Sequence, residues 1–395
     1  MIEISNLRKE SCEGYTKLIV DINSDIERLD NENQIWVSVE DKYAYMLNDI
    51  TYDCCLTLPV YMAMYYKTDL HIKGKVSKKL YRNIVDYVSY ILQSFSNELK
   101  LVNIYADGHE DIDNLQEVNA TGISCGVDSL ATVYKYYELE KDLDYKLTHL
   151  FFLNCGWHGS LDNSNTIPLF NKRALQAEDA ANQIGLPLVK VDSNLHAFLY
   201  DLDDKASYFN LYYIIFAMGK GISKYYLSSS FSYEEVMKYG YRARNRDFSE
   251  YGDPMTLPLL STPNTTIISD GCQYKRSQKT ELIADWEVSK KYLNVCCRHS
   301  DDPNVDEKNC SECAKCNRTL IALDAMGKLT EYSKVFDLNK YKKNKRKILW
   351  QLAINYDKDA FSKDNYNFCE EKGMNLPSIK KVRILRRIKR MFCFK

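Results

Sequence analysis

The sequence lacks any apolar run long enough to cross a membrane, which takes about 18 residues or more. Its most apolar stretch, from Tyr208 to Met218, is shorter than that and predicts a buried helix. The first residues are polar and lack the apolar core of a secretory signal peptide. We therefore expect a cytoplasmic protein.

The chain also has almost no net charge, because 53 Lys and Arg residues face 54 Asp and Glu residues. A nucleic-acid partner is therefore not expected from the whole-chain balance. The 13 cysteines show no framework of paired spacings, and their number is odd. This argues against disulfides and for a reducing compartment.

With 395 residues and 45% hydrophobic content, the chain can bury a large core. We expect three regions: an N-terminal α/β accessory unit (1–116), an α/β domain (117–330) and a helical C-terminal region (331–395). The accessory unit should contain a long helix near Ser77–Phe95, and the polar segment Asp107–Gln116 should be the linker. Its expected strands are Tyr15–Ile22, Gln34–Val39, Tyr43–Leu47 and Leu101–Tyr105.

From residue 117 strands and helices alternate, which predicts a parallel sheet with helices on both faces. The expected strands are Val118–Ile123, Thr148–Leu153, Leu188–Val191 and Tyr225–Ser228. One helix is expected directly after the first strand and its turn. Four more are expected at Asn171–Ile184, at Phe209–Met218, near Ser277–Lys291 and from Arg318 onward. A loop-rich insert should occupy Phe231–Thr266.

A Ser- and Gly-containing turn links the first of these strands to its helix. It consists of Ser124, Cys125, Gly126, Val127, Asp128 and Ser129. Backbone N–H groups in such a turn, with the helix N-terminus, form an anion site, and Asp128 can hold a Mg²⁺ that bridges phosphates. The alternative is an ordinary turn whose Asp and Ser cap the helix. The turn contains no Gly-Lys-Ser/Thr, so it is not a Walker A loop.

Four cysteines near the end of the α/β domain are spaced like zinc ligands: Cys296, Cys310, Cys313 and Cys316. Four thiolates would make a closed, structural Zn²⁺ site. Cys297 and His299 are alternatives for the first ligand, and free cysteines or an iron–sulfur cluster are alternatives for the site.

The turn at Ser124–Ser129 resembles the Ser-Gly-Gly-x-Asp-Ser signature of the PP-loop ATP pyrophosphatase superfamily, with Cys125 at a usual Gly position. With Cys310–Cys316 it resembles the cyano-deazaguanine synthases of queuosine-precursor biosynthesis over about residues 120–325. The chain resembles more fully an uncharacterised group of larger PP-loop proteins, some encoded among surface-polysaccharide gene clusters. The residues that carry this are Asp192–Leu195, Ser228–Tyr233, Asp270–Gly271, Arg276, Lys279 and Asn309–Thr319.

The resemblance implies a Rossmann-like domain that cleaves ATP between its α and β phosphates, with ATP, Mg²⁺ and Zn²⁺ as cofactors. A carboxylate or carbonyl oxygen of an unknown acceptor would be adenylated, and a nitrogen or sulfur nucleophile would displace AMP. Asp128, Ser129, Arg276 and Lys279 are the candidate catalytic residues. The rival functions are a non-catalytic nucleotide-binding or scaffold protein and a tRNA-modifying enzyme.

Arg276 and Lys279 are one helical turn apart and can point at one anion, or lie on a solvated helix face. Asp192 and Asn194 follow a strand and are either ligand-binding residues or turn formers. Trp157 and His158 follow the strand beside which the superfamily seats adenine, and loop packing is the alternative.

The C-terminal tail, Ile379–Lys395, carries eight cations and no acidic residue, with apolar residues at helical spacing. Such a helix suits the surface of an anionic membrane, which would make the protein peripheral to its inner face. It can equally pack its apolar stripe on the protein itself, and an RNA contact is a weaker option.

Overall fold

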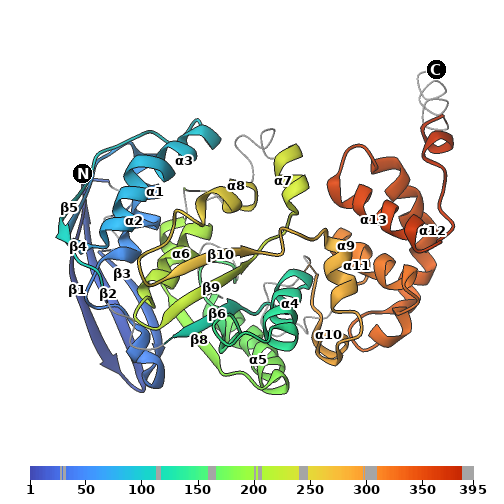
Figure 1. Ribbon diagram of the computed structural model, residues 1–395, viewed down its shortest axis with the longest axis horizontal. Coiled ribbons are helices and arrows are strands. Elements are labelled where there is room, and N and C mark those ends of the chain that lie inside the picture. The colour runs from blue at the N-terminus through green and yellow to red at the C-terminus, as the bar shows by residue number, and fades with distance from the viewer. Residues whose placement is uncertain are drawn as a thin grey trace.

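The computed structural model describes residues 1–26, 29, 33–112, 117–158, 166–199, 202, 207–239, 248–296, 298 and 309–384. A large twisted sheet occupies the N-terminal and central part, and helices of the C-terminal part form a separate group beside it (Figure 1). The chain is therefore an α/β protein, as the sequence predicts.

Ten described strands form one sheet in the order β10-β9-β6-β7-β8-β3-β2-β1-β4-β5. Their bounds are β1 Ile2–Cys12, β2 Tyr15–Ser24, β3 Gln34–Glu40, β4 Leu70–Val76, β5 Ile104–His109, β6 Val118–Gly122, β7 His149–Leu153, β8 Leu188–Ser193, β9 Ile222–Ser228 and β10 Thr266–Asp270.

The strands from β10 to β8 all pair in parallel, as the alternating sequence predicts. Beyond β8 the sheet continues into the N-terminal strands through the antiparallel pair β8–β3. β3 pairs with β2, and β2 with β1, in antiparallel orientation. β1 pairs with β4, and β4 with β5, in parallel orientation. Residues 1–112 and the central strands therefore share one sheet.

The helices lie on both faces of this sheet and in the C-terminal group (Figure 1). Their bounds are α1 Leu58–Tyr66, α2 Lys78–Asn83, α3 Ser89–Phe95, α4 Val127–Val133, α5 Thr166–Ile184, α6 Ser207–Ala217, α7 Tyr233–Tyr239, α8 Phe248–Thr256, α9 Arg276–Leu282, α10 Glu287–Tyr292, α11 Ala314–Ala325, α12 Leu338–Asn355 and α13 Ala360–Glu371. A π-helical turn, Ile84–Val88, joins α2 to α3, so the long helix expected there is present.

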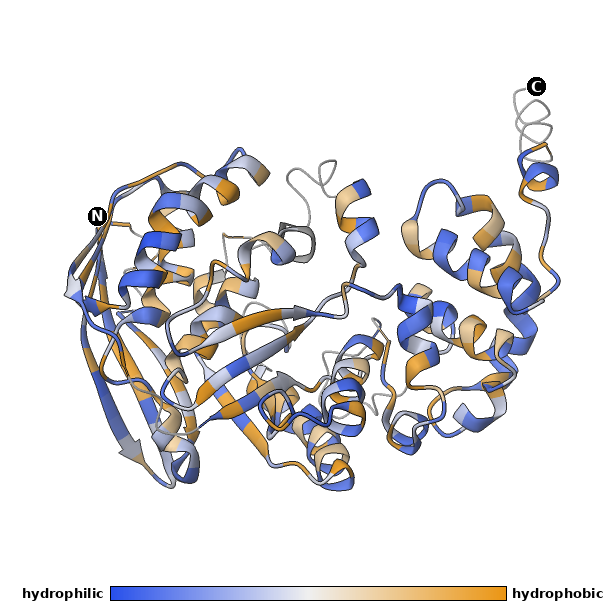
Figure 2. Ribbon diagram, viewed as in Figure 1, coloured by the Kyte–Doolittle hydropathy of each residue, from blue (hydrophilic) through white to orange (hydrophobic). Residues whose placement is uncertain are grey.

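Successive residues of the central strands pack into two different cores. Phe151 and Tyr225 belong to the core shared with the N-terminal half and α6, whereas Phe152 and Tyr226 belong to the core under α4, α5 and the C-terminal helices. This alternation follows from the pleat of a strand, and hydrophobic residues recur along the strands in Figure 2. The sheet is therefore covered on both faces.

Several expected elements are wrong in detail. Tyr43–Leu47 is not a strand: Tyr43 to Met46 lie in the 3-10 helix Asp41–Met46, and Leu47 caps it. Tyr43 and Met46 are buried three residues apart. Such spacing suits three residues per turn. β5 begins later than expected and runs to His109, so the linker does not begin at Asp107, and residues 113–116 lie outside the described part. The helix near Ser277–Lys291 is two helices, α9 and α10.

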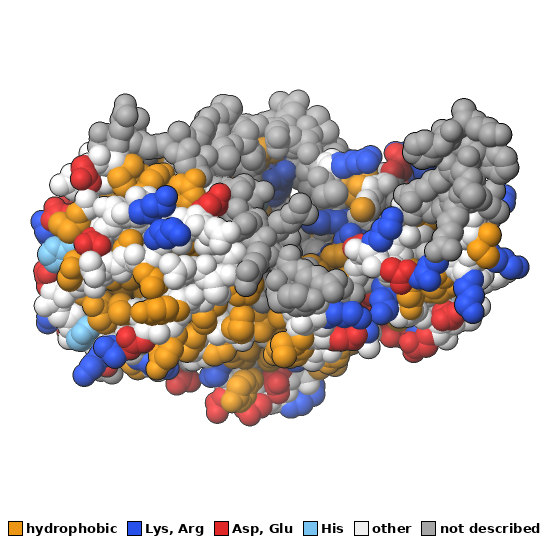
Figure 3. All heavy atoms as spheres, turned by 90° about the horizontal axis from the view of Figure 1, so that it is seen from above, with side chains coloured by type: hydrophobic (Ala, Val, Ile, Leu, Met, Phe, Trp, Pro, Cys, Tyr) orange, Lys and Arg blue, Asp and Glu red, His pale blue; other side chains and the backbone are white. Residues whose placement is uncertain are grey.

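The C-terminal region is helical, as expected. Residues 379–384 are helical, and 385–395 lie outside the described residues, so the membrane-binding tail stays a prediction. Lys and Arg side chains are frequent over this region in Figure 3. No helix of the described residues is long and apolar enough to cross a membrane.

Candidate functional site

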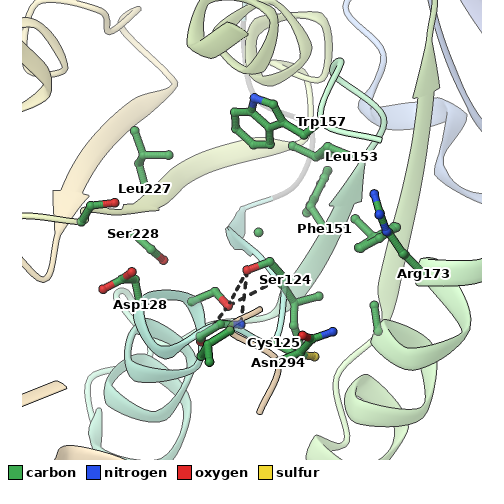
Figure 4. Close-up of a pocket in the computed structure, with 18 of the residues that line it drawn as sticks. Ser124, Cys125, Asp128, Phe151, Leu153, Trp157, Arg173, Leu227, Ser228 and Asn294 are labelled. Atoms are coloured by element: carbon green, nitrogen blue, oxygen red, sulfur yellow. Dashed lines mark hydrogen bonds between the residues drawn. The ribbon is translucent and has the colours of Figure 1, made fainter. Parts of the chain in front are cut away.

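The turn between β6 and α4 folds around two serine side chains. The Ser124 N–H donates to Ser129 Oγ at 3.3 Å, and the Gly126 N–H lies 3.4 Å from Ser124 Oγ (Figure 4). Gly126 directly precedes α4, which continues through a π-helical stretch to Leu139. The turn therefore brings hydroxyls and N–H groups together at a helix N-terminus, which is the arrangement that binds anions.

Cys125 has a left-handed backbone with φ of 56°. Glycine reaches this region without steric cost, whereas a residue with a Cβ, such as cysteine, does not. The Cys125 side chain is 2% exposed and belongs to the core beneath α4. Burial raises the pKa of its thiol to about 12. The thiol is thus a neutral packing group at physiological pH.

Arg276 and Lys279 converge on Asp128 in the first turn of α4. Lys279 Nζ lies 3.2 Å from Asp128 Oδ1 and also donates to the Ser229 carbonyl oxygen, while Arg276 bonds to Asp128 Oδ2. The Lys279 side chain is only 1% exposed, so the solvated-face alternative is wrong. Gly271 makes room for it: a Cβ at this residue, whose φ is +84°, would lie 3.0 Å from Lys279 Cε.

The C-terminal helices hold α9 in this position. The buried carboxylate of Asp364, on α13, accepts hydrogen bonds from the Ser277 N–H at 2.9 Å and the Ser277 hydroxyl at 2.6 Å. Burial raises the pKa of this carboxyl, and the bonds from Ser277 oppose that shift. Because Ser277 follows Arg276, these two bonds fix the start of the helix that carries both cations.

A cavity of about 660 Å³ opens above the turn. The turn forms its floor, and Asp128 and Arg173 lie at opposite sides of it (Figure 4). Its walls bring together side chains from β7, β9, α5, α6, α11 and α13 and from the segments that follow β7 and β9. Among them are Phe152, Trp157, His158, Tyr208, Ser228, Ser230, Lys315, Arg318 and Phe361. Asp128 is the only carboxylate among the described residues that line it.

One wall of this cavity is aromatic. Trp157 is 48% exposed and meets the Tyr208 ring edge-on at 5.5 Å, and His158 lies 5.2 Å from the Phe152 ring. Arg173 Nη1 donates to His158 Nδ1 at 3.4 Å, which leaves Nε2–H to donate to the Leu153 carbonyl oxygen at 3.2 Å. Trp157 and His158 therefore line the cavity, as well as making packing contacts.

Asp192 and Asn194 have structural roles. Asn194 joins β8 to β3: its Oδ1 accepts from the Trp36 N–H at 2.8 Å, and its Nδ2 donates to the Gln34 carbonyl oxygen at 2.8 Å. The Asp192 carboxylate accepts from the Asn154 side chain at 2.6 Å. Neither residue is among the described residues that line the cavity. Asp192 lies within β8 and Asn194 bridges two strands, so these contacts give the pair a structural role in the sheet.

The sulfur atoms of Cys296, Cys310, Cys313 and Cys316 all lie within 4.8 Å of one another. Cys296 and Cys313 are 4.0 Å apart, and Cys310 and Cys316 are 3.9 Å apart. Zinc–sulfur bonds of about 2.3 Å require an S–S spacing of about 3.8 Å in a tetrahedron, so the four thiols fit a metal ion such as zinc. Cys297 and His299 lie outside the described residues.

One hydrogen bond connects the segment before Cys296 to the turn, and a second joins that segment to the residue before Cys310. The Asn294 N–H donates to the Cys125 carbonyl oxygen at 2.8 Å, and the Val295 N–H donates to Asn309 Oδ1 at 2.8 Å. Asn294 and Val295 directly precede Cys296, and Asn309 precedes Cys310. A metal that fixes the cysteines would therefore also fix the segment that holds the turn.

Sequence reasoning did not identify Arg173, Gln176, Lys315, Phe361 or Asp364 as site residues. Arg173, Gln176 and Ala177 share one face of α5 and line the cavity together, a spacing that could have been read from the sequence. Phe361 and Asp364 come from a helix far along the chain, and nothing in the local sequence indicates their partners. No family model, curated protein or solved structure matches this chain.

Proposed function

We propose that the chain is a PP-loop ATP pyrophosphatase that adenylates a carboxylate or carbonyl oxygen of an acceptor. The observation that carries this proposal is the meeting of three features beside one cavity: the turn, a helix N-terminus, and the pair Arg276, which lines the cavity, and Lys279, which is buried behind Asp128. Two cations against the single charge of Asp128 leave an excess of one positive charge there. Such a site suits the departing pyrophosphate of ATP.

In this proposal the hydroxyls of Ser124 and Ser129 and the N–H groups of the turn bind the β and γ phosphates. Arg276 and Lys279 offset the charge that develops as pyrophosphate leaves. The exposed ring of Trp157 in the aromatic wall offers a surface on which adenine can stack. A Mg²⁺ held through Asp128 would supply further charge neutralisation on the phosphates, and a single carboxylate beside substrate phosphates fits that ion.

The reaction would run in two displacements. An acceptor oxygen attacks the α phosphorus, and the bond from that phosphorus to the bridging oxygen breaks, so pyrophosphate leaves with the electron pair. A nitrogen or sulfur nucleophile then attacks the activated carbon and loses its proton, and AMP leaves with the carbon–oxygen electrons. The residues of the turn act on the first leaving group, and the cysteine cluster, with zinc, would keep Asn294 in place.

The rival proposal is a nucleotide-binding protein without chemistry, and the left-handed Cys125 is the observation that favours it. The test is to incubate the full chain with Mg·ATP and a panel of carboxylate and amide acceptors, and to identify the nucleotide products. An adenylating enzyme forms AMP and pyrophosphate in equal amounts with its own acceptor, and the tRNA alternative predicts turnover only with tRNA. ATP binding without any turnover would favour the rival, and ADP with phosphate would contradict both.

A further inference from the structure

The outward face of α12 is positively charged. The helix contains six cations and no acidic residue. Lys345 is paired with Asp324 at 2.7 Å. The other five cations are exposed, and none of them forms a salt bridge with a described residue: Lys340, Lys342, Lys343, Arg346 and Lys347. We call these five residues the α12 basic face.

The internal stability of α12 does not account for these side chains. Lys342 and Arg346 are four residues apart, as are Lys343 and Lys347, and like charges at this spacing repel each other along a helix. Lys340 lies in the first turn, where the positive end of the helix dipole disfavours a cation. A helix that only faces water usually mixes both signs of charge on its surface. An anionic partner would offset this repulsion by attracting all five side chains.

The α12 basic face is broad. Tyr341, Ile348 and Leu352 are buried and mark the side of α12 that packs on α11 and α13. At about 100° per residue, the five cations spread over about 160° on the opposite side of the helix. A wide convex face suits an extended anionic surface better than one small anion.

The basic tail begins beside this helix (Figure 1). Val382 is buried in the core to which α12 contributes, and Arg383 bonds to Asp357, two residues after α12 ends. The part of α12 between Lys342 and its end is about 20 Å long. The tail, Ile379–Lys395, carries eight cations and no acidic residue. One end of the molecule therefore holds two basic regions about 20 Å apart.

We propose that the α12 basic face, with the tail, holds the protein on an anionic lipid bilayer. Clustered Lys and Arg side chains bind such a surface, and a cluster with a second membrane signal gives stable attachment. A bilayer presents anionic headgroups over an area that reaches both basic regions, which a single phosphate group cannot. This inference concerns where the protein acts, and it is independent of the proposed function.

A bilayer fits the α12 basic face better than RNA does. RNA also carries an extended array of phosphates, but proteins that recognise it usually add exposed aromatic side chains on which the bases stack. Among residues 309–384, Ile384 is the only large hydrophobic side chain that is exposed, and it is aliphatic. Ile384 lies on the helix that leads into the rest of the tail, where an apolar side chain suits the bilayer interface.

The experiment measures sedimentation of the full chain with vesicles of phosphatidylglycerol and phosphatidylcholine in equal parts, and with vesicles of phosphatidylcholine alone. The test variant replaces three cations of the α12 basic face: Lys342→Gln, Lys343→Gln and Lys347→Gln. The matched control replaces three exposed lysines elsewhere: Lys78→Gln, Lys100→Gln and Lys141→Gln. Glutamine has about the helix propensity of lysine, so α12 should stay folded, and circular dichroism checks this. A chain that ends at Ile384 separates α12 from the rest of the tail.

We expect the full chain to bind the anionic vesicles and not the neutral ones, and salt should weaken the binding. The partition coefficient should fall about tenfold or more in the test variant and stay within about twofold in the control. The chain that ends at Ile384 should keep part of the binding. The proposal is overturned if the full chain does not bind the anionic vesicles, if the test variant and the control bind alike, or if the shortened chain loses all binding. Displacement from the vesicles by tRNA at an equal phosphate concentration would also overturn it, because an RNA-binding face predicts that result.

Discussion

The N–H of Asn294 donates a hydrogen bond to the carbonyl oxygen of Cys125 at 2.8 Å, across 169 positions of the sequence. This bond fastens the left-handed residue of the turn to the segment that leads into the cysteine cluster. The two motifs that the sequence shows separately are therefore one structural unit. The predictions below follow from that connection and from the contacts around Asp128.

Metal removal should weaken nucleotide binding. We expect one zinc per chain, and stripping it should loosen the segment with Asn294 and lower the affinity for Mg·ATP. Metal analysis and ATP titration before and after chelation, with Mg²⁺ restored, measure both effects. Cys313→Ser should give unstable protein, whereas Cys12→Ser, at an exposed cysteine, should not. A metal-free, fully stable Cys313→Ser variant would show that the cluster is not a structural metal site.

The Cys125→Gly protein should be more stable to unfolding than the Cys125→Ala protein. Alanine keeps the steric cost of the left-handed backbone, about 1 kcal/mol, and glycine removes it. Both variants lose the buried sulfur, so their difference isolates the backbone. Chemical denaturation of Cys125→Gly and Cys125→Ala measures this difference. The reverse order, which is usual at ordinary positions, would mean that residue 125 does not have positive φ in solution.

The Cys125 thiol should lower stability at high pH. Its pKa is raised by burial from 9.0 to about 12, so the folded state keeps a proton that the unfolded state loses first. Its contribution to stability is complete below pH 9 and falls as pH rises toward 12. Comparison with Cys125→Ala isolates it from other groups, and Cys125 should react with iodoacetamide far more slowly than the exposed Cys12. Equal alkylation rates at pH 8 would contradict the burial.

Asp364 should act as a positioning residue. Asp364→Ala leaves the buried Ser277 N–H and hydroxyl without their acceptor, which costs about 1–3 kcal/mol of stability, and it frees the helix that carries Arg276. We expect weaker Mg·ATP binding as well as a lower melting temperature. Asp364→Asn keeps an acceptor oxygen and should recover most of both. Normal ATP affinity in Asp364→Ala would show that α9 does not depend on this contact.

Much of the fold follows from sequence patterns, and the departures have physical causes. The strands β6, β7, β8 and β9 lie where their apolar, β-branched runs put them. The edge strand β10, Thr266–Asp270, is not predicted, because only its isoleucines form an apolar signal. β1 begins with the buried alternating pair Ile2 and Ile4, and β4 with Leu70 and Ile72. This alternation is a strand signal from which both elements could have been predicted. Tyr43–Leu47 has the composition of a strand, but burial of Tyr43 and Met46 on one side selects a 3-10 helix.

The site follows from the sequence where its residues are close together in the chain. The turn and the C-x-x-C-x-x-C segment are local, and so is the pair Arg276 and Lys279. This pair meets Asp128 because α9 packs against α4. Arg276 and Asp128 are 148 positions apart in the sequence, so no local pattern predicts their contact. The contributions of Lys315, Phe361 and Asp364 depend on how the C-terminal helices fold back, which no local pattern encodes.

The most direct test of the account is the dissociation constant of Mg·ATP, measured by calorimetry for three proteins. These are the natural chain, Arg276→Gln and the surface control Lys342→Gln. The account predicts that the natural chain and the control bind one ATP per chain equally well. Arg276→Gln should bind at least about tenfold more weakly, a loss of ~1.4 kcal/mol, because it removes a phosphate-facing cation. No binding by the natural chain at millimolar ATP, or equal binding by all three proteins, would contradict the account.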